Sequence, residues 1–169
     1  MIIKPSLDDV LAYRNDELVA MFSKKLSVPY RDAGELFVDL KKWMWLIGIR
    51  EEGGNLFPSF PEQWIIDSFW HEFILYTHAY MDFCNTYFGR YIHHAPTPEG
   101  LGGANIALAM SDMARFVEIN KCTMKMAMTE VLEKLGIDVV IRWYRDIPAR
   151  YPIKLSSQKN QLMMREEYA

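Results

Sequence analysis

The sequence has little cysteine, no excess of basic charge and no long apolar run. Its 169 residues include two cysteines, Cys84 and Cys122, and no CxxC or zinc-ribbon spacing. Two isolated cysteines exclude a disulfide framework and indicate a reducing, intracellular setting. The formal net charge is −3, which argues against a nucleic-acid-binding protein that relies on a broad basic face.

No uninterrupted apolar stretch approaches the roughly 20 residues that are needed to cross a bilayer. The first ten residues, MIIKPSLDDV, lack the apolar core of a signal peptide, and their two aspartates do not fit a transit peptide. We therefore expect a cytoplasmic protein that does not contact a membrane.

Helical periodicity dominates what is present. Half of the sequence is hydrophobic and 14% is aromatic, which is typical of a globular chain. Apolar side chains recur every three to four residues in four segments, at 7–22, 33–47, 65–80 and 113–135. Each of these segments predicts a helix with one buried face, and the buried stripe of the last one includes Met113, Ala127 and Val131.

Capping residues and turn-forming residues give the expected ends of these helices. Ser6 and Pro61 favour helix starts, and Gly89 and Gly136 favour helix ends. Glycine and proline mark loops at 51–61 and 95–103. The short segment 138–144, with the sequence DVVIRWY, is compatible with either a helix or a strand.

These elements predict one fold class. We expect an all-α protein, a single-domain irregular helical bundle of about five helices over residues 1–155. Residues 156–169 are expected to form a polar C-terminal tail. No internal repeat and no low-complexity tract divides the chain.

All four histidines fall between His71 and His94, in a segment rich in aromatic residues. On a helix, Asp67 and His71 are one turn apart and their side chains can share a ligand. A chain reversal at Gly89 could return His93 and His94 toward Asp67. The resulting group, one carboxylate and two or three imidazoles, suits a divalent transition metal, zinc or iron.

A structural role for the same residues is the simpler interpretation. Asp67 and His71 can form an ordinary pair on a helix surface, and His93 and His94 can bond to loop carbonyls. There is no HExxH motif, so the sequence does not support the chemistry of a zinc protease of that type. Cys84 lies among aromatic residues and is expected to fill space in the core.

The histidine segment also resembles the conserved segment of the glycine-rich domain-containing protein (GRDP)-like family. The resemblance covers about 30 residues and lies in four pairs, Trp70-His71, Phe83-Cys84, Phe88-Gly89 and His93-His94, together with Asp67, Ile74, Leu75, Thr77, Tyr80 and Pro96. It implies an α-helical domain, no particular reaction, and functional importance for Asp67, Trp70, His71, Cys84, His93 and His94. Three features differ: Phe73 stands where many members carry a second histidine, His78 occupies a position that is often basic in the family, and the glycine-rich region is absent.

A C-terminal stretch interleaves arginine with aromatic side chains, a mixture typical of protein–protein hot spots. Its members are Arg142, Trp143, Tyr144, Arg145, Arg150 and Tyr151. If this stretch binds a partner, we expect an acidic protein surface and not RNA. The alternative is that the aromatic rings cap the core while the basic groups face water.

These observations leave two functional hypotheses. The first is a small non-catalytic protein-interaction or adaptor protein in which the Asp/His cluster is a buried polar structural element, and whose partner is another protein. The second is a metal-binding protein or metal-dependent enzyme that uses Asp67, His71, His93 and His94 as its metal site. The sequence names neither a substrate nor an oligomeric state.

Overall fold

The structure is a computed structural model that describes residues 4–50, 58, 60–94 and 111–152. The described residues form helices and no strand, which confirms the predicted all-α class. The expected loop at 95–103 and the expected tail at 156–169 lie outside the described residues, as does most of the loop at 51–61. None of the described helices combines the length and the apolar character that a membrane span requires.

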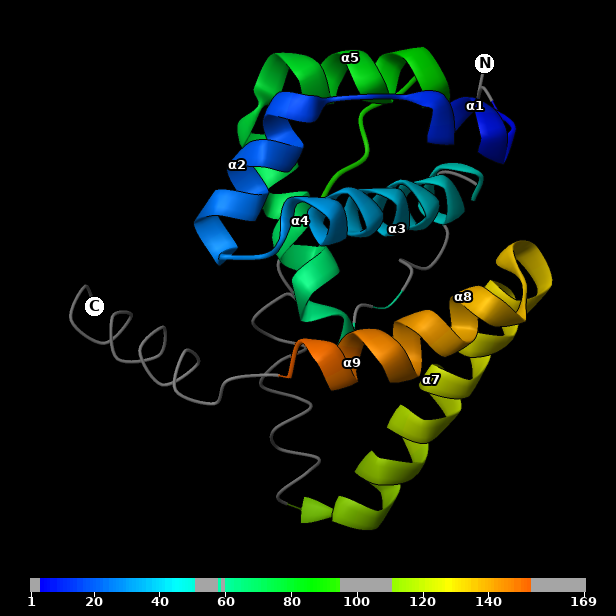
Figure 1. Ribbon diagram of the computed structural model, residues 1–169. Helices are drawn as coiled ribbons and strands as arrows, with labels where there is room; N and C mark the ends of the chain where they lie inside the picture. Colours follow the sequence, from blue (N-terminus) through cyan, green and yellow to red (C-terminus); the bar gives the residue numbers. More distant parts are fainter. Residues whose placement is uncertain (1–3, 51–57, 59, 95–110, 153–169) are drawn as a thin grey trace, which may run out of the picture.

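The helices follow one another in a simple order along the chain (Figure 1). They are α1 (Leu7–Ala12), α2 (Asp16–Leu26), α3 (Tyr30–Gly48), a 3₁₀ turn η1 (Pro61–Gln63), α4 (Trp64–Leu75), α5 (Thr77–Phe88), α7 (Met113–Leu135), α8 (Ile137–Ile141), a π-helical turn η2 (Arg142–Asp146) and α9 (Ile147–Arg150). Because α8, η2 and α9 continue into one another, the described residues form seven helical rods, and the expected number of about five is wrong.

The observed helices differ from the predicted ones in three places. The predicted helix at 7–22 is divided into α1 and α2, because the Asn15 side chain accepts a hydrogen bond from the Leu18 N–H (3.0 Å) and starts a new helix. The predicted helix at 65–80 ends at Tyr76, whose φ of −82° and ψ of 61° separate α4 from α5. The ambiguous segment 138–144 is helical.

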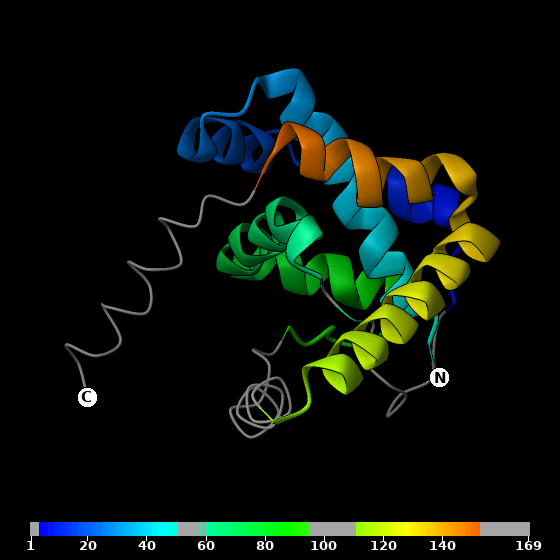
Figure 2. The ribbon, with the colours of Figure 1, turned by 90° about the horizontal axis from the view of Figure 1, so that it is seen from below.

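Helix α3 lies at the centre of the molecule. In Figure 1, α1, α2 and α5 lie on one side of α3, and the rod formed by α8, η2 and α9 lies on the other; Figure 2 shows this rod crossing α3. Trp43 of α3 is 1% exposed, and its ring centroid is 6.2 Å from that of Trp70 on α4 and 6.2 Å from that of Trp143 on η2. One buried indole therefore joins three parts of the chain.

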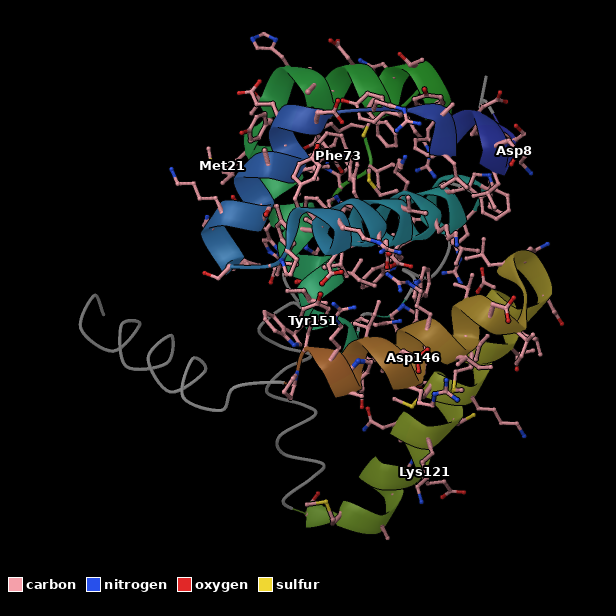
Figure 3. All side chains as sticks on the ribbon, viewed as in Figure 1. Asp8, Met21, Phe73, Lys121, Asp146 and Tyr151 are labelled. Atoms are coloured by element: carbon pink, nitrogen blue, oxygen red, sulfur yellow. The ribbon has the colours of Figure 1, made fainter. Side chains whose placement is uncertain are left out.

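The predicted buried faces of α3 and α4 are confirmed. The α3 stripe contains Ala33, Leu36, Leu40 and Met44, each at most 1% exposed. Phe73 of α4 is fully buried and is seen between α3 and α5 in Figure 3.

Close packing also occurs at the end of α3. A Cβ atom built on Gly48 would lie 2.3 Å from the Phe88 ring, so the α3 backbone touches α5 where no larger residue fits.

Only half of the buried face predicted for α7 is correct. Ala127 and Val131 are buried, whereas Met113 is 58% exposed. Figures 1 and 2 show the first half of α7 extending away from the other helices. Met113 is exposed because no described element covers that half of the helix.

A buried lysine joins α1 to α3. Lys41 is 4% exposed, and its Nζ donates hydrogen bonds to the carbonyl oxygens of Leu11 (2.6 Å) and Tyr13 (2.9 Å) at the end of α1. These carbonyls have no partner within the helix, so the lysine caps it. Burial, together with the nearby positive charge of Arg14, lowers the pKa of Lys41 to about 8.

This shift predicts an increase in stability with pH. The unfolded chain keeps Lys41 protonated up to a pKa of about 10.5, so between pH 8 and 10 the unfolded state binds more protons and the free energy of unfolding rises with pH. A neutral amine still has two hydrogens for its two carbonyl partners. Across this range the free energy of unfolding of the natural protein should rise by up to about 2 kcal/mol relative to that of Lys41→Met in urea titrations. The comparison is made between variants because burial raises the pKa of the Cys84 thiol, which lowers the stability of both chains as the pH rises. Lys42→Met should keep the pH dependence of the natural protein; parallel pH dependences of the natural protein and Lys41→Met would contradict the prediction.

Candidate metal centre

Three side chains from two separate segments of the chain meet beside α4. Asp67 and His71 lie one turn apart on this helix, and His94 comes from the segment that follows α5. Helix α5 ends at Gly89, whose φ of 64° is left-handed and turns the chain back. The chain return predicted for the histidine pair is therefore present for His94.

The distances within the group are short. Asp67 Oδ1 is 3.2 Å from His94 Nε2, and Asp67 Oδ2 is 3.3 Å from His71 Nδ1. One ligand atom from each of the three residues lies within 4.8 Å of the others. A carboxylate and two imidazoles at this spacing need only small side-chain movements to reach metal–ligand distances of about 2.0–2.2 Å.

The group is closed on one side and open on the other. The His94 side chain is 16% exposed and that of Asp67 is 26% exposed, whereas that of His71 is 60% exposed. Solvent can therefore reach the group from the His71 side. An ion held there would have protein ligands on one face and room for water on the other.

The ring nitrogens of the two histidines have different surroundings. His71 Nδ1 is 2.8 Å from the backbone carbonyl oxygen of Asp67 and 3.3 Å from its Oδ2. A proton on Nδ1 would serve the first contact and leave Nε2, the other ring nitrogen, with a lone pair for a metal; a metal on Nδ1 would replace that contact. His94 Nε2 is buried and has no hydrogen-bond partner among the described residues; its 3.2 Å approach to Asp67 lacks the angle of a hydrogen bond. A buried ring nitrogen next to a carboxylate requires either a proton or a metal ion to be favourable.

Two further residues hold His94 in place. The Trp70 indole stacks on the His94 ring, with centroids 4.2 Å apart and planes 5° from parallel. Trp70 Nε1–H donates to the Tyr80 hydroxyl oxygen (2.9 Å), and the Tyr80 hydroxyl donates to the carbonyl oxygen of Ile92 (2.5 Å). Ile92 is 2% exposed and lies two residues before His94. The chain of contacts fixes both the ring and the backbone that carries it.

Tyr80→Phe tests this positioning role. The change removes one hydroxyl and leaves the buried Trp70 N–H and the Ile92 carbonyl without their partner, which costs about 1–3 kcal/mol of stability. It should also loosen His94 and weaken metal binding by about tenfold or more, as loss of an orienting contact does at metal sites. Zinc titration of the folded variant by calorimetry measures the second effect separately from the first.

Tyr87→Phe is the matched control. Its hydroxyl belongs to the same helix but lines a groove beside α1, so its loss should leave zinc affinity unchanged. Equal zinc affinity in Tyr80→Phe and in the natural protein would show that Tyr80 does not position His94.

The other candidate residues of the segment lie outside this group. His93 is exposed, and its ring contacts Tyr91 with centroids 4.8 Å apart. His78 is exposed on α5, beyond the break at Tyr76. Cys84 is fully buried, and burial raises the pKa of its thiol. The metal site suggested by the structure is therefore Asp67, His71 and His94, without His93.

The arginine-rich and aromatic C-terminal stretch makes internal contacts. Trp143 is fully buried and donates from Nε1 to Asp39 (2.9 Å), which also accepts from Arg142 Nε (2.8 Å). Arg150 pairs with Asp32. These contacts attach η2 and α9 to α3. The buried Trp143 agrees with the interpretation that the aromatic rings cap the core, whereas Arg142 pairs with a buried carboxylate and does not simply face water.

The remaining members of that stretch differ in exposure. Tyr144 is half-buried, and the Tyr151 carbonyl accepts from Trp64 Nε1 (2.7 Å). Arg145 is 73% exposed and pairs with its neighbour Asp146. No contact here tests binding of a partner by these residues, so that part of the interaction hypothesis stays a prediction.

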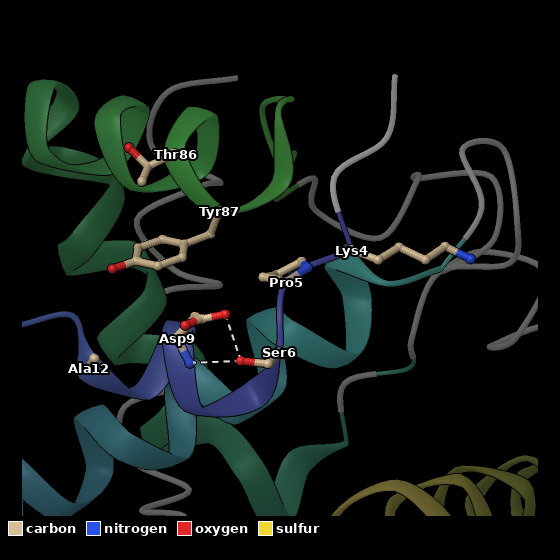
Figure 4. Close-up of a pocket in the computed structure, with 7 residues that line it drawn as sticks. All are labelled: Lys4, Pro5, Ser6, Asp9, Ala12, Thr86 and Tyr87. Atoms are coloured by element: carbon tan, nitrogen blue, oxygen red, sulfur yellow. Dashed lines mark hydrogen bonds between the residues drawn. The ribbon is translucent and has the colours of Figure 1, made fainter.

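A separate open groove of about 550 Å³ lies between α1 and α5 (Figure 4). Its lining is Lys4, Pro5, Ser6, Asp9, Ala12, Thr86 and Tyr87. Ser6 Oγ donates to Asp9 Oδ2 (2.6 Å) and accepts from the Asp9 N–H (3.2 Å), which is the cap of α1. The groove does not include the Asp67 group, and two of its polar side chains already serve the helix cap.

Comparison with known proteins identifies a family. The family model described as UCP032817-like matches residues 13–105, more than half of the chain, and the chain therefore belongs to that family. The matched range contains Asp67, His71 and His94 and ends before α7. No curated protein and no solved structure matches the sequence.

This finding corrects the resemblance to the GRDP-like family. The match is to a different family, so the expected membership is wrong. The shared pairs are not specific to one family, because Trp-His, Phe-Cys and Phe-Gly contain aromatic and turn residues that many packed helices use. In this structure Phe83 and Phe88 are core residues, and Gly89 follows the last residue of a helix.

Proposed function

We propose that the protein binds one divalent transition metal ion, zinc or iron, through Asp67, His71 and His94. The single observation that supports this most is the convergence of these three donors from two separate segments, with the buried His94 Nε2 facing Asp67 without a hydrogen bond.

The donor set agrees with this class of metal. Zinc sites with an open coordination position use three protein ligands, among them two histidines and a carboxylate, and keep water in the fourth position. Two histidines and one carboxylate also form the facial triad that holds non-haem Fe(II). The exposed His71 side of the group leaves space for that water. A bound zinc ion would lower the pKa of such a water and supply a nucleophile near neutral pH.

The alternative proposal is a non-catalytic interaction protein in which the same residues form a structural cluster. With protonated imidazoles, the distances of 3.2 and 3.3 Å to Asp67 are those of ion pairs that fasten the chain after α5 to α4. This proposal needs no metal. It predicts that the metal-free protein is fully stable and that zinc does not raise its melting temperature.

Metal analysis separates the two proposals. The protein, made without a histidine tag and stripped with a chelator, is titrated with zinc and with iron(II) under anaerobic conditions. We expect one ion per chain and a melting temperature that rises with ligand concentration, because binding to the native state alone adds about 2.7 kcal/mol at 100 times the dissociation constant. Zinc binding with a stoichiometry far below one, and no thermal shift, would support the structural cluster instead.

A further inference from the structure

An exposed strip runs along α7 on the side opposite its buried face. Ile119 is 47% exposed, Met126 is 68% exposed and Cys122 is exposed. At 3.6 residues per turn these positions point away from the buried Ala127 and Val131. The outer strip, in order, is Arg115, Ile119, Cys122, Met126, Thr129 and Glu133.

The spacing of the strip is that of a coiled-coil seam. Its members follow one another at intervals of four, three, four, three and four residues, which is the a/d pattern of a heptad repeat. Basic Arg115 stands at one end and acidic Glu133 at the other. They are 18 residues apart, five helical turns, so both lie on the same line of the helix.

We propose that a second copy of this chain covers the strip, in an antiparallel pair of α7 helices related by a twofold axis that crosses the strip midway between Cys122 and Met126. The two ends of the strip carry opposite charges. A twofold axis places the positive end of one copy opposite the negative end of the other, so the strip is complementary to itself. In this register Arg115 faces Glu133 of the other copy twice, Ile119 faces Thr129, and Cys122 faces Met126. Each facing pair joins an a position to a d position, as antiparallel seams require.

The pairing is expected to be weak. Three side chains, Ile119, Cys122 and Met126, provide most of the apolar area, well below the roughly 1,200 Å² of stable interfaces. Lys125 would lie near Lys125 of the second copy at the margin of the seam, which opposes association. A dimer that forms reversibly at high protein concentration is therefore the expected state.

A disulfide test measures the register itself. Cys122 faces position 126 of the second copy, but the two Cys122 residues are offset by four residues, about 6 Å along the axis. We mix the natural protein with the double variant Cys122→Ser/Met126→Cys under mild oxidation. We expect the mixed disulfide-linked dimer to exceed either self-linked dimer several-fold, as read by mass spectrometry. Cys84 is fully buried in both chains and does not compete.

The matched control places the second cysteine off the strip. Leu132 is 46% exposed on the same helix but on another face, so an equal mixture with Cys122→Ser/Leu132→Cys should give no more mixed dimer than the roughly twofold statistical excess that random pairing produces. The same ratio of mixed to self-linked dimer in the two mixtures, or no disulfide-linked dimer in either, would overturn the proposed register.

Charge reversal provides an independent readout by sedimentation equilibrium. Arg115→Glu places a second carboxylate opposite Glu133 and should weaken association by about tenfold or more. The double variant Arg115→Glu/Glu133→Arg restores opposite charges and should restore the natural dissociation constant. A natural protein that is monomeric at every concentration, or a double variant as weak as the single one, would exclude a second copy as the occupant of the strip.

Discussion

Replacing His94 with alanine is expected to abolish stoichiometric metal binding while the protein stays folded. His94 supplies one of the three donors that the described residues bring together, and it is the one that comes from outside α4. Because loss of an orienting contact alone costs about 10–100-fold in metal affinity, loss of a ligand should cost more than about 100-fold. Elemental analysis and zinc calorimetry measure the loss, and circular dichroism verifies the fold.

His93→Ala is the matched control for this prediction. The two histidines are neighbours in the chain, but only His94 lies within reach of Asp67. We expect His93→Ala to keep both the stoichiometry and the affinity of the natural protein. Equal metal loss in the two variants would show that the effect comes from disturbance of the segment and not from a ligand at His94.

Asp39→Ala is expected to cause a large loss of stability. Asp39 is 1% exposed and accepts hydrogen bonds from Arg142 and Trp143. Burial raises the pKa of this carboxyl, and the two donors oppose that effect. Its removal leaves the fully buried Trp143 N–H without its acceptor, while the Arg142 side chain is 33% exposed and keeps Glu35 (3.5 Å) as a partner. The expected cost is therefore about 3 kcal/mol, the lower end of the range for a broken buried pair.

Thermal unfolding gives the readout for Asp39. For a chain of this size each kcal/mol shifts the melting temperature by about 2–4 °C, so we expect a fall of at least about 6 °C. Asp146→Ala is the control, because the Arg145–Asp146 pair is exposed and such pairs contribute less than about 1 kcal/mol. Similar melting temperatures for the two variants would contradict the structural role assigned to Asp39.

Local sequence signals predicted much of the fold. Ser6 accepts a hydrogen bond from the Asp9 N–H at the start of α1, and Gly89 and Gly136 end α5 and α7 with positive φ. Capping and turn preferences act within a few residues, so one sequence contains them in full. The break at Tyr76 has no such signal, because neither proline nor glycine stands there.

The candidate site was predicted in part for the same reason. Asp67 and His71 are one helical turn apart, and a spacing of four residues can be seen in any sequence. The sequence could not choose between His93 and His94. That choice depends on the Tyr80 hydroxyl bonding to the Ile92 carbonyl, a contact between α5 and the chain that follows it.

Asp39 shows the clearest limit of prediction from sequence. It stands within the apolar part of α3, next to the buried Leu40, which is a local signal of a buried polar residue. Its partners, Arg142 and Trp143, are more than 100 residues away along the chain. No local pattern pairs residues at that separation, so the sequence leaves open whether this arginine-rich stretch binds a partner or packs onto the core.

The most direct test of the metal proposal is a crystal structure of the zinc-soaked protein with anomalous diffraction at the zinc edge. We expect one strong anomalous peak between Asp67, His71 and His94, about 2.0–2.2 Å from one atom of each. A peak that instead lies on His78 or His93, or no peak near Asp67 at saturating zinc, would contradict the proposal.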